Sequence, residues 1–320
     1  VNIPKEINFD FARILGYYLG DGSHEIDRIT FFEQRKGVAE YYRNQIEQAF
    51  RVKADLRFRK EKNYWQIRVY SRILAQLFKQ IFPEKDKTRY ETIPPIILKS
   101  SDESLAAFIG GFFDAEGYVN KSRVAAGFNN EKLARQIQLV LLRLGIIASI
   151  SEYDNRKNPY SKNIRYTVAI DDLESVKKFY ALNGFVSTEK KEKTKNLILK
   201  RSNRNKVRQL VVNGKEVARV IRNSGLNTRQ FGCPDFFNNK KQLSKEVFKN
   251  RILNKIVDID LKKRLEMFYN SNLIVVKIAN IQPVGISKTV DIETKSHNLI
   301  ANGLLVHNSS QRFHRITEGL

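Results

Sequence analysis

Cysteine is nearly absent from this sequence. Its 320 residues include only one, Cys233, so no internal disulfide can form. No apolar run approaches the roughly 18–20 residues of a membrane-spanning helix, and no stretch has the pattern of a secretory signal. These absences exclude a disulfide-stapled or membrane-spanning chain, and we expect a cytoplasmic protein. Because the first residue is Val1 rather than Met, we also expect a piece of a longer protein.

Acidic residues are scarce relative to basic ones. The chain has 34 Asp and Glu against 57 Lys and Arg, a formal net charge of +23. A chain this basic typically binds a polyanion, and nucleic acid is the commonest one. The alternative is a lysine-rich surface that serves solubility alone.

A repeated motif is the most informative feature that is present. Residues 14–22 read ILGYYLGDG and residues 109–117 read IGGFFDAEG. Each is an apolar helical run with a glycine at its third position, and each ends in an acid followed by glycine. An acid in the last turn of a helix faces the negative end of the helix dipole, which is unfavourable. Finding Asp21 and Glu116 in this position suggests that both acids are required there.

The repeat extends beyond the motifs. At the same spacing along the chain, Arg28 aligns with Arg123 and Gln34 aligns with Asn129. We therefore predict a duplicated unit of about a hundred residues, longer than the usual solenoid repeats. Two copies predict a pseudo-symmetric pair in which the motif helices meet at the middle.

The hydrophobic patterns predict the same plan in both copies. Helices are expected at 9–20, 37–50, 72–82, 104–115, 131–144 and 172–182, and strands at 28–34, 54–60, 64–71, 123–129, 147–153 and 164–170. The predicted fold class is α+β, with two αββαββα-like halves that each have an antiparallel sheet backed by helices. The halves are assigned to residues 1–100 and 101–200.

The hairpin at 54–71 alternates between apolar and basic side chains, so it should have one face of each kind. A two-stranded ribbon fits the major groove of DNA, and Arg and Gln side chains can read bases or hold phosphates. The candidate DNA-binding residues are Arg28, Gln34, Arg57, Arg59, Gln66, Arg68, Arg123, Asn129 and Arg165.

The paired acids suggest metal chemistry. Two carboxylates at adjacent helix ends repel each other unless a cation lies between them, and oxygen ligands suit Mg²⁺ or Mn²⁺. Such an ion can activate water and stabilise the leaving oxygen of a phosphodiester. Gly16 and Gly111 would let the two helices approach closely. The alternative for each motif alone is an ordinary buried helix with a glycine cap.

These motifs resemble the paired motifs of the LAGLIDADG (DOD-type) homing endonucleases in their single-chain form, over about residues 8–200. The resemblance implies a monomeric enzyme with internal pseudo-symmetry that cuts long, asymmetric sites in double-stranded DNA, with metal held by Asp21 and Glu116. It also implies one lysine near the site in each half: Lys87 in KDKTRYETIP and Lys190 in STEKKEK. It assigns no role to Asp114. The alternative is a DNA- or RNA-binding module on the same scaffold that does not cleave.

Residues 201–272 form a basic helical segment. Residues 215–226 (KEVARVIRNSGL) resemble the start of a helix-turn-helix element, with helix on both sides of a Ser-Gly turn. We consider DNA contact by this segment a hypothesis.

From residue 273 the pattern becomes β, and Asn302-Gly303 is a strong hairpin signal. An Asn followed by Ser permits a specific reaction there. The Asn308 side-chain amide can attack its own backbone carbonyl, closing a succinimide and releasing the amine of Ser309. His307 could polarise that carbonyl, His297 could move protons, and Ser309 offers a hydroxyl nucleophile. The alternative is an edge hairpin with incidental histidines.

The segment closely resembles the C-terminal splicing blocks of inteins. The resemblance places Asp291 and His297 in the first block, and His307, Asn308 and Ser309 in the second. It implies a partial all-β Hint domain over residues 273–308, whose splicing partner is an N-terminal half that is missing here. Residues 309–320 (SSQRFHRITEGL) would then be host protein, and they resemble archaeal class-I peptide chain release factors.

Overall fold

The computed structural model describes residues 1–85, 91–157, 163–182, 184–201, 212–270, 280–283, 285, 286, 288, 292, 294, 295, 298–301 and 303–307. They form two compact units, one within residues 1–204 and 293–320 and one within residues 205–292. No helix in these ranges is long and apolar enough to cross a membrane.

The first half of the larger unit contains helices and strands close to those expected. They are α1 (Phe9–Asp21), β1 (Gly22–His24), β2 (Arg28–Glu33), α2 (Lys36–Phe50), β3 (Asp55–Arg59), β4 (Tyr64–Tyr70) and α3 (Arg72–Ile81). The side chains of Asn8 and Ser71 cap α1 and α3 by accepting hydrogen bonds from backbone N–H groups of the first turn. The sequence patterns did not identify the three-residue strand β1.

The second half repeats this order. It contains α4 (Pro95–Leu98), α5 (Asp102–Glu116), β5 (Gly117–Val119), β6 (Val124–Phe128), α6 (Glu131–Arg143), β7 (Ser149–Asp154), β8 (Ile164–Ile170), α7 (Leu173–Ala181) and α8 (Thr188–Arg201). Ser101 and Asn130 cap α5 and α6 in the same way. The short elements α4 and β5 and the charged helix α8 were not predicted.

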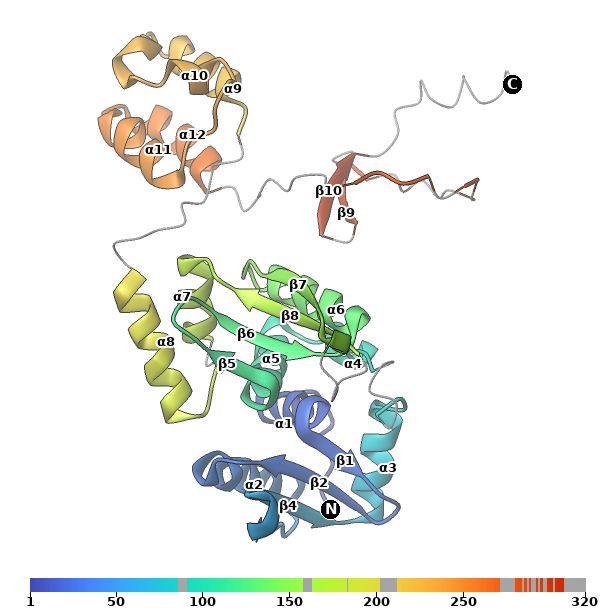
Figure 1. Cartoon of the computed structure of the whole chain (residues 1–320). Coiled ribbons are helices and arrows are strands. Elements are labelled where there is room, and N and C mark those ends of the chain that lie inside the picture. The colour runs from blue at the N-terminus through green and yellow to red at the C-terminus, as the bar shows by residue number, and fades with distance from the viewer. Residues whose placement is uncertain are drawn as a thin grey trace. The chain divides into compact units, whose positions relative to one another are not determined.

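Both halves build the same antiparallel sheet. The strand order is β1-β2-β4-β3 in the first and β5-β6-β8-β7 in the second. Figure 1 shows α1 and α5 next to each other between the two sheets, and these helices contact each other along their length. The fold is therefore mixed α+β with two four-stranded antiparallel sheets, and the motif helices form the interface between the halves.

Each sheet has one face packed on the core. In the first sheet, Ile29, Phe31, Ile67 and Val69 are fully buried against the helices. Because side chains alternate along a strand, the opposite face carries the residues in between. One expectation for the hairpin fails at its tip: Phe58 lies on the apolar side and contacts Trp65, with the ring centroids 4.9 Å apart, yet it is 46% exposed.

The smaller unit is helical and has a core of its own. It consists of α9 (Gly214–Asn223), α10 (Pro234–Phe237), α11 (Lys245–Arg251) and α12 (Ile259–Tyr269), with 3₁₀ turns η3 (Thr228–Phe231) and η4 (Leu253–Lys255). Their apolar faces enclose Val217, Ile221, Phe236, Phe248 and Leu265.

The predicted helix-turn-helix is only half present. α9 is followed by a turn in which Gly225 has a φ of 77°, but the next element is the four-residue 3₁₀ turn η3 rather than a helix. Gly232 in the left-handed region (φ 64°) ends this turn, and Pro234 begins a separate short helix. The second element is thus too short to lie along a groove as a recognition helix does.

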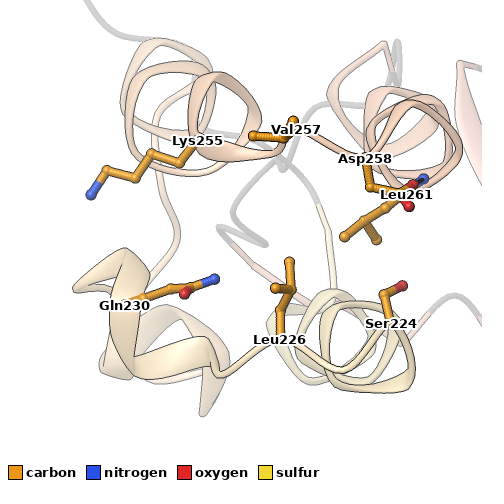
Figure 2. Close-up of a pocket in the computed structure, with 7 residues that line it drawn as sticks. All are labelled: Ser224, Leu226, Gln230, Lys255, Val257, Asp258 and Leu261. Carbon is orange, nitrogen blue, oxygen red and sulfur yellow. Dashed lines mark hydrogen bonds between the residues drawn. The ribbon is translucent and has the colours of Figure 1, made fainter.

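Figure 2 shows a pocket in the helical unit, and its volume is about 430 Å³. Its lining residues are Ser224, Leu226, Gln230, Lys255, Val257, Asp258 and Leu261. All of them belong to the helical unit, so the pocket includes none of the predicted site residues.

Near the C-terminus, β9 (Asn298–Ala301) and β10 (Leu304–His307) form an antiparallel hairpin. Gly303 has a φ of 78°, as a tight hairpin turn requires. The other strands expected in this region, at 273–281 and 288–293, fall mostly outside the described residues. Within residues 273–308, the structure therefore describes one hairpin, and the expected Hint domain stays a prediction.

Candidate functional site

Glycines allow α1 and α5 to meet backbone to backbone. A Cβ atom on Gly16 would lie 1.9 Å from the carbonyl oxygen of Phe108, and one on Gly111 would lie 2.1 Å from that of Arg13. Both distances are far inside van der Waals contact with backbone atoms that cannot move aside. The motif glycines therefore set the separation of the helices.

This close approach brings the C-terminal ends of the two helices together. A Cβ on Gly20 would lie 2.5 Å from the Cβ of Ala115 and 3.2 Å from the Cγ of Glu116. α1 ends at Asp21 and α5 ends at Glu116, each followed by a glycine. The two predicted acids thus lie at adjacent helix ends, and both are half-buried.

Burial and a neighbouring carboxylate make each acid harder to ionise. Burial and the charge of Glu33 raise the pKa of Asp21 to about 6, although nearby Lys85, Lys190 and Arg35 oppose this rise. Burial and the charge of Asp21 raise the pKa of Glu116 to about 7. The carboxylates therefore interact across the helix interface, and a cation between them would relieve the repulsion.

Two buried lysines lie against the same helix ends. The Nζ of Lys190 donates hydrogen bonds to the carbonyl oxygens of Asp114, at 2.8 Å, and Phe113, at 3.3 Å. The Nζ of Lys85 donates to the carbonyl oxygen of Leu19, at 2.7 Å. These carbonyls belong to the last turns of α5 and α1, where backbone acceptors lack helical partners and cations are favourable.

The lysines are equivalent in the two halves, because Leu19 and Asp114 occupy the same motif position. The sequence interpretation selected Lys190 in the second half and Lys87 in the first. Lys87 lies outside the described residues. Lys85, two positions earlier, was not selected, because spacing alone cannot choose between two lysines in one loop, and the role of Lys87 stays a prediction.

Lys190 and Lys85 have different surroundings. Burial and the charge of Arg35 lower the pKa of Lys190 to about 8. Lys85 forms an ion pair with Glu91 at 3.1 Å, and both side chains are buried. The second-half lysine therefore holds its proton loosely near neutral pH, whereas the first-half lysine is tied to a carboxylate.

Asp114, to which no role had been assigned, is the hub of a buried network. Its carboxylate accepts hydrogen bonds from Arg13 at 2.6 Å, from the hydroxyl of Tyr42 at 2.7 Å and from the backbone N–H of Val186 at 2.7 Å. Asp114 is 1% exposed and Arg13 is 3% exposed. The pair links α1 to α5, and the bond to Val186 fixes the chain shortly before the turn of α8 that carries Lys190.

A second charged pair borders Asp21. Glu33 accepts hydrogen bonds from Arg35 Nε at 2.8 Å and from the Tyr17 hydroxyl at 3.0 Å. Arg35 also donates to the backbone carbonyl of Asp114 at 3.2 Å. Glu33 and Arg35 had not been selected as site residues, because nothing in their local sequence shows that β2 ends beside the end of α1.

The predicted DNA-binding residues gather on the sheet faces opposite the core. In the first sheet, the pairing register puts Arg28, Arg57, Arg59, Gln66 and Arg68 on that face. In the second sheet, Arg165 is exposed on the corresponding face and donates to the carbonyl oxygen of Gly127 at 3.0 Å. The other candidates, Gln34, Arg123 and Asn129, lie just outside the ends of β2 and β6.

The donor set suits a hard cation that keeps water ligands. In the described part of the chain, no three His, Cys, Asp or Glu side chains are grouped closely enough to hold a metal ion by themselves. Mg²⁺ is commonly bound by one or two carboxylates together with waters and substrate phosphates. Asp21 and Glu116 fit that pattern, since carboxylate oxygens suit Mg²⁺ or Mn²⁺ better than a softer metal.

The structure describes only one residue of the expected splicing site, His307. The backbone of His307 ends β10, where it pairs with Asn298. Asp291, His297, Asn308 and Ser309 lie outside the described residues.

Comparison with known proteins gives a family match for one part of the chain. Residues 103–184 match the family described as LAGLIDADG-like domain. The match covers α5 and the second sheet, including Glu116, and so includes the second helix of the interface. The first half of the larger unit has the same strand order as this matched second half.

Two curated relatives come from the archaeon Methanocaldococcus jannaschii. Glutamine–fructose-6-phosphate aminotransferase is 25% identical over 322 residues, which are 98% of this chain and 28% of that protein. Replication factor C small subunit is 28% identical over 221 residues, which are 68% of this chain and 12% of that protein. The chain thus spans less than a third of the length of either relative.

A solved structure similar to this chain is that of I-DmoI in complex with DNA and Mn. The TM-score is 0.42 and the identity 21%, and the match covers 56% of this chain and 98% of that one.

Proposed function

We propose that this chain is a site-specific DNA endonuclease that depends on a divalent cation. The observation that carries the proposal is the coupled pair of half-buried carboxylates, Asp21 and Glu116, at adjacent helix ends between two antiparallel sheets. Two repelling acids at this position do not help the fold to be stable. They do provide oxygen ligands for a cation that also binds a phosphodiester. The match of residues 103–184 to the LAGLIDADG-like domain supports this function.

Each group in the site has a role that its position allows. Asp21 and Glu116 would hold the cation, Mg²⁺ or Mn²⁺, which when bound lowers the pKa of a water and stabilises the leaving oxygen. Lys190, with a pKa of about 8, can hold or exchange a proton close to the reacting phosphate near neutral pH. Lys85, close to Asp21 and Glu116, favours an approaching phosphate through its ammonium group.

We further infer that the chain is part of an intein. Its relatives include an aminotransferase and a replication factor subunit, proteins with unrelated functions that share only a short part of their length with this chain. An element inserted into different hosts would produce such a pattern. Asn308 next to Ser309, after the hairpin of β9 and β10, supports a C-terminal splicing segment that acts with an N-terminal half supplied by the precursor.

Cleavage can be tested on DNA that spans the uninterrupted insertion point in the host gene. With Mg²⁺, the parent protein should cut both strands, and Asp21→Asn and Glu116→Gln should each cut roughly 100-fold or more slowly. The matched control is Asp27→Asn, an exposed acid in the loop between β1 and β2, which should cut like the parent. An Asp21→Asn protein that cuts as fast as the parent contradicts the assignment. Tight binding without cleavage in Mg²⁺ or Mn²⁺ favours a binding module instead.

Splicing needs its own test. Co-expression with the missing N-terminal half should give a ligated host product, detected by its mass. Asn308→Ala should block release of the C-terminal segment, because the succinimide can no longer form. A ligated product that Asn308→Ala leaves unchanged would refute the splicing proposal without bearing on the endonuclease.

A further inference from the structure

The two sheets present equivalent positions with very different side chains. Pairing of β2 with β4 and of β6 with β8 follows the same register, so each position on one outer face has a partner on the other. Arg68 of the first sheet corresponds to Ala169 of the second, Gln66 to Thr167, and Arg57 to Ser151. Three long hydrogen-bonding side chains in one half thus correspond to three short ones in the other.

The long side chains of the first sheet form a prepared row. Arg68 donates a hydrogen bond to the Oε1 of Gln66 at 2.6 Å, which restrains both side chains. Arg57 on the neighbouring strand is held by Asp55 at 3.1 Å. Side chains restrained in this way lose less entropy when they bind.

Arg68 also has bonding capacity left over. Its Nε is buried and has no hydrogen-bond partner among the residues that the structure describes. A buried donor without an acceptor is unfavourable, and a base or phosphate oxygen would satisfy it once the Arg68 side chain shifts towards the ligand.

The centre of the outer face of the second sheet carries short side chains. Ala125 and Ala169 are buried, and Gly127 leaves the space that the guanidinium of Arg165 occupies, 2.8 Å from where a Cβ would be. Longer side chains occur only towards the rim, at Tyr118 on one side and at Tyr153 and Arg165 on the other. A hydroxyl or methyl group can make one contact to a base edge, whereas Arg and Gln can pair with guanine or adenine through two bonds.

We propose that the two halves share sequence recognition unequally. The first sheet reads its half-site by direct contacts from Arg57, Gln66 and Arg68. The second sheet tolerates base changes in its half-site and holds DNA mainly through Arg165 and the rim. This inference rests on the proposed function, because it assumes that the outer faces of both sheets bind double-stranded DNA.

The test is selection of binding sites from a randomised double-stranded DNA library by the full chain in Ca²⁺, followed by single base-pair changes across the selected site. We expect one half-site in which wrong bases lower affinity roughly 5- to 150-fold each, as bidentate readout allows. In the other half-site, changes should have effects within about threefold at most positions.

Variants assign the halves to the sheets. Arg68→Ala and Gln66→Ala should flatten the preferences of the selective half-site alone, and their melting temperatures report that the fold is intact. The matched variants Thr167→Ala and Ser151→Ala should leave all preferences within about twofold. Thr167→Gln, at a position that is only partly buried, should make the tolerant half-site more selective.

The outcomes separate this inference from the function it assumes. A library from which no site is enriched contradicts the proposed function. A site that is enriched with equal discrimination in both halves, loosened as much by Thr167→Ala as by Arg68→Ala, overturns the unequal division alone.

Discussion

At the scale of single residues, the centre is defined by acids held where ionisation is unfavourable. Asp21 and Glu116 each lie at the negative end of their own helix and are partly buried. They also lie near each other. Lys85 and Lys190 offset part of this by donating to the last-turn carbonyls. Both acids still keep raised pKa values, from burial first and from neighbouring carboxylates second, and a bound cation would offset both causes.

The raised pKa values predict how stability depends on pH without metal. The pKa of Asp21 rises from 3.8 to about 6 and that of Glu116 from 4.5 to about 7. Between these limits the unfolded chain releases protons that the folded chain keeps, so both groups lower the free energy of unfolding as pH rises from about 4 to 7. We expect Asp21→Asn and Glu116→Gln to stabilise the metal-free protein more at pH 8 than at pH 5. The gain should be on the order of 1 kcal/mol after solvent screening.

Urea unfolding of parent and variants at both pH values in EDTA measures this difference. Asp27→Asn, on an exposed loop, is the control and should show no such dependence. Mg²⁺ at pH 8 should stabilise the parent more than either variant, because only the parent has both ligands. A stability difference between parent and variants that stays constant from pH 5 to 8 would contradict the coupling described here.

The sequence allowed prediction of some of these residues and not others. Asp21 and Glu116 could be predicted because a local motif, an apolar helix ending in acid and glycine, specifies their place on the helix. Lys85, Glu33 and Arg35 could not, because their positions depend on where distant strands and loops pass the helix ends. No local periodicity reports such long-range contacts.

At the scale of helices and strands, the interface of α1 and α5 depends on glycine. Gly16→Ala and Gly111→Ala each place a methyl group about 2 Å from a backbone carbonyl of the facing helix. The helices must then separate, and overpacking of this kind typically destabilises by about 1–3 kcal/mol or more. We expect lower melting temperatures for both variants, together with weaker Mg²⁺ binding, since separated helices no longer bring Asp21 and Glu116 together.

Gly37 provides the matched control for these substitutions. It lies in the first turn of α2. A Cβ added there would meet open space, because none of the described atoms lies within 4 Å apart from those of its chain neighbours and of its own helix backbone. Gly37→Ala should therefore leave stability unchanged or raise it by up to about 1 kcal/mol. If Gly16→Ala melts at the same temperature as Gly37→Ala, the close helix contact is not required.

Hydrophobic patterns predicted the helices and strands better than the contacts between them. Three strands of each sheet, the hairpins and six of the longer helices were predictable from hydrophobic periodicity, which depends on neighbours in sequence. The Arg13–Asp114 pair was not, because its partners are 101 residues apart and a buried charge in an apolar helix looks unfavourable until the partner is known. The second element of the predicted helix-turn-helix failed for a local reason, since Gly232 and Pro234 interrupt the helix.

At the scale of the whole molecule, the net charge of +23 predicts DNA binding that weakens steeply with salt. Each phosphate contact contributes about −0.9 to the slope of log affinity against log salt concentration. Arg219, Arg222 and Arg229 are exposed on α9 and η3 of the helical unit. If that unit contacts DNA, replacing all three by Gln should make the slope shallower by about 1 or more and weaken binding of every sequence alike.

Binding measured at a series of KCl concentrations by fluorescence anisotropy, on the site selected from the library, provides the slope. Lys177→Gln, on α7 at the helical side of the second sheet, is the control for loss of a surface charge and should leave the slope unchanged. The triple variant should keep the sequence preferences of the parent, because phosphate contacts position a protein without reading bases. An unchanged slope in the triple variant would show that DNA binding belongs to the two sheets and that this face of the helical unit serves another purpose.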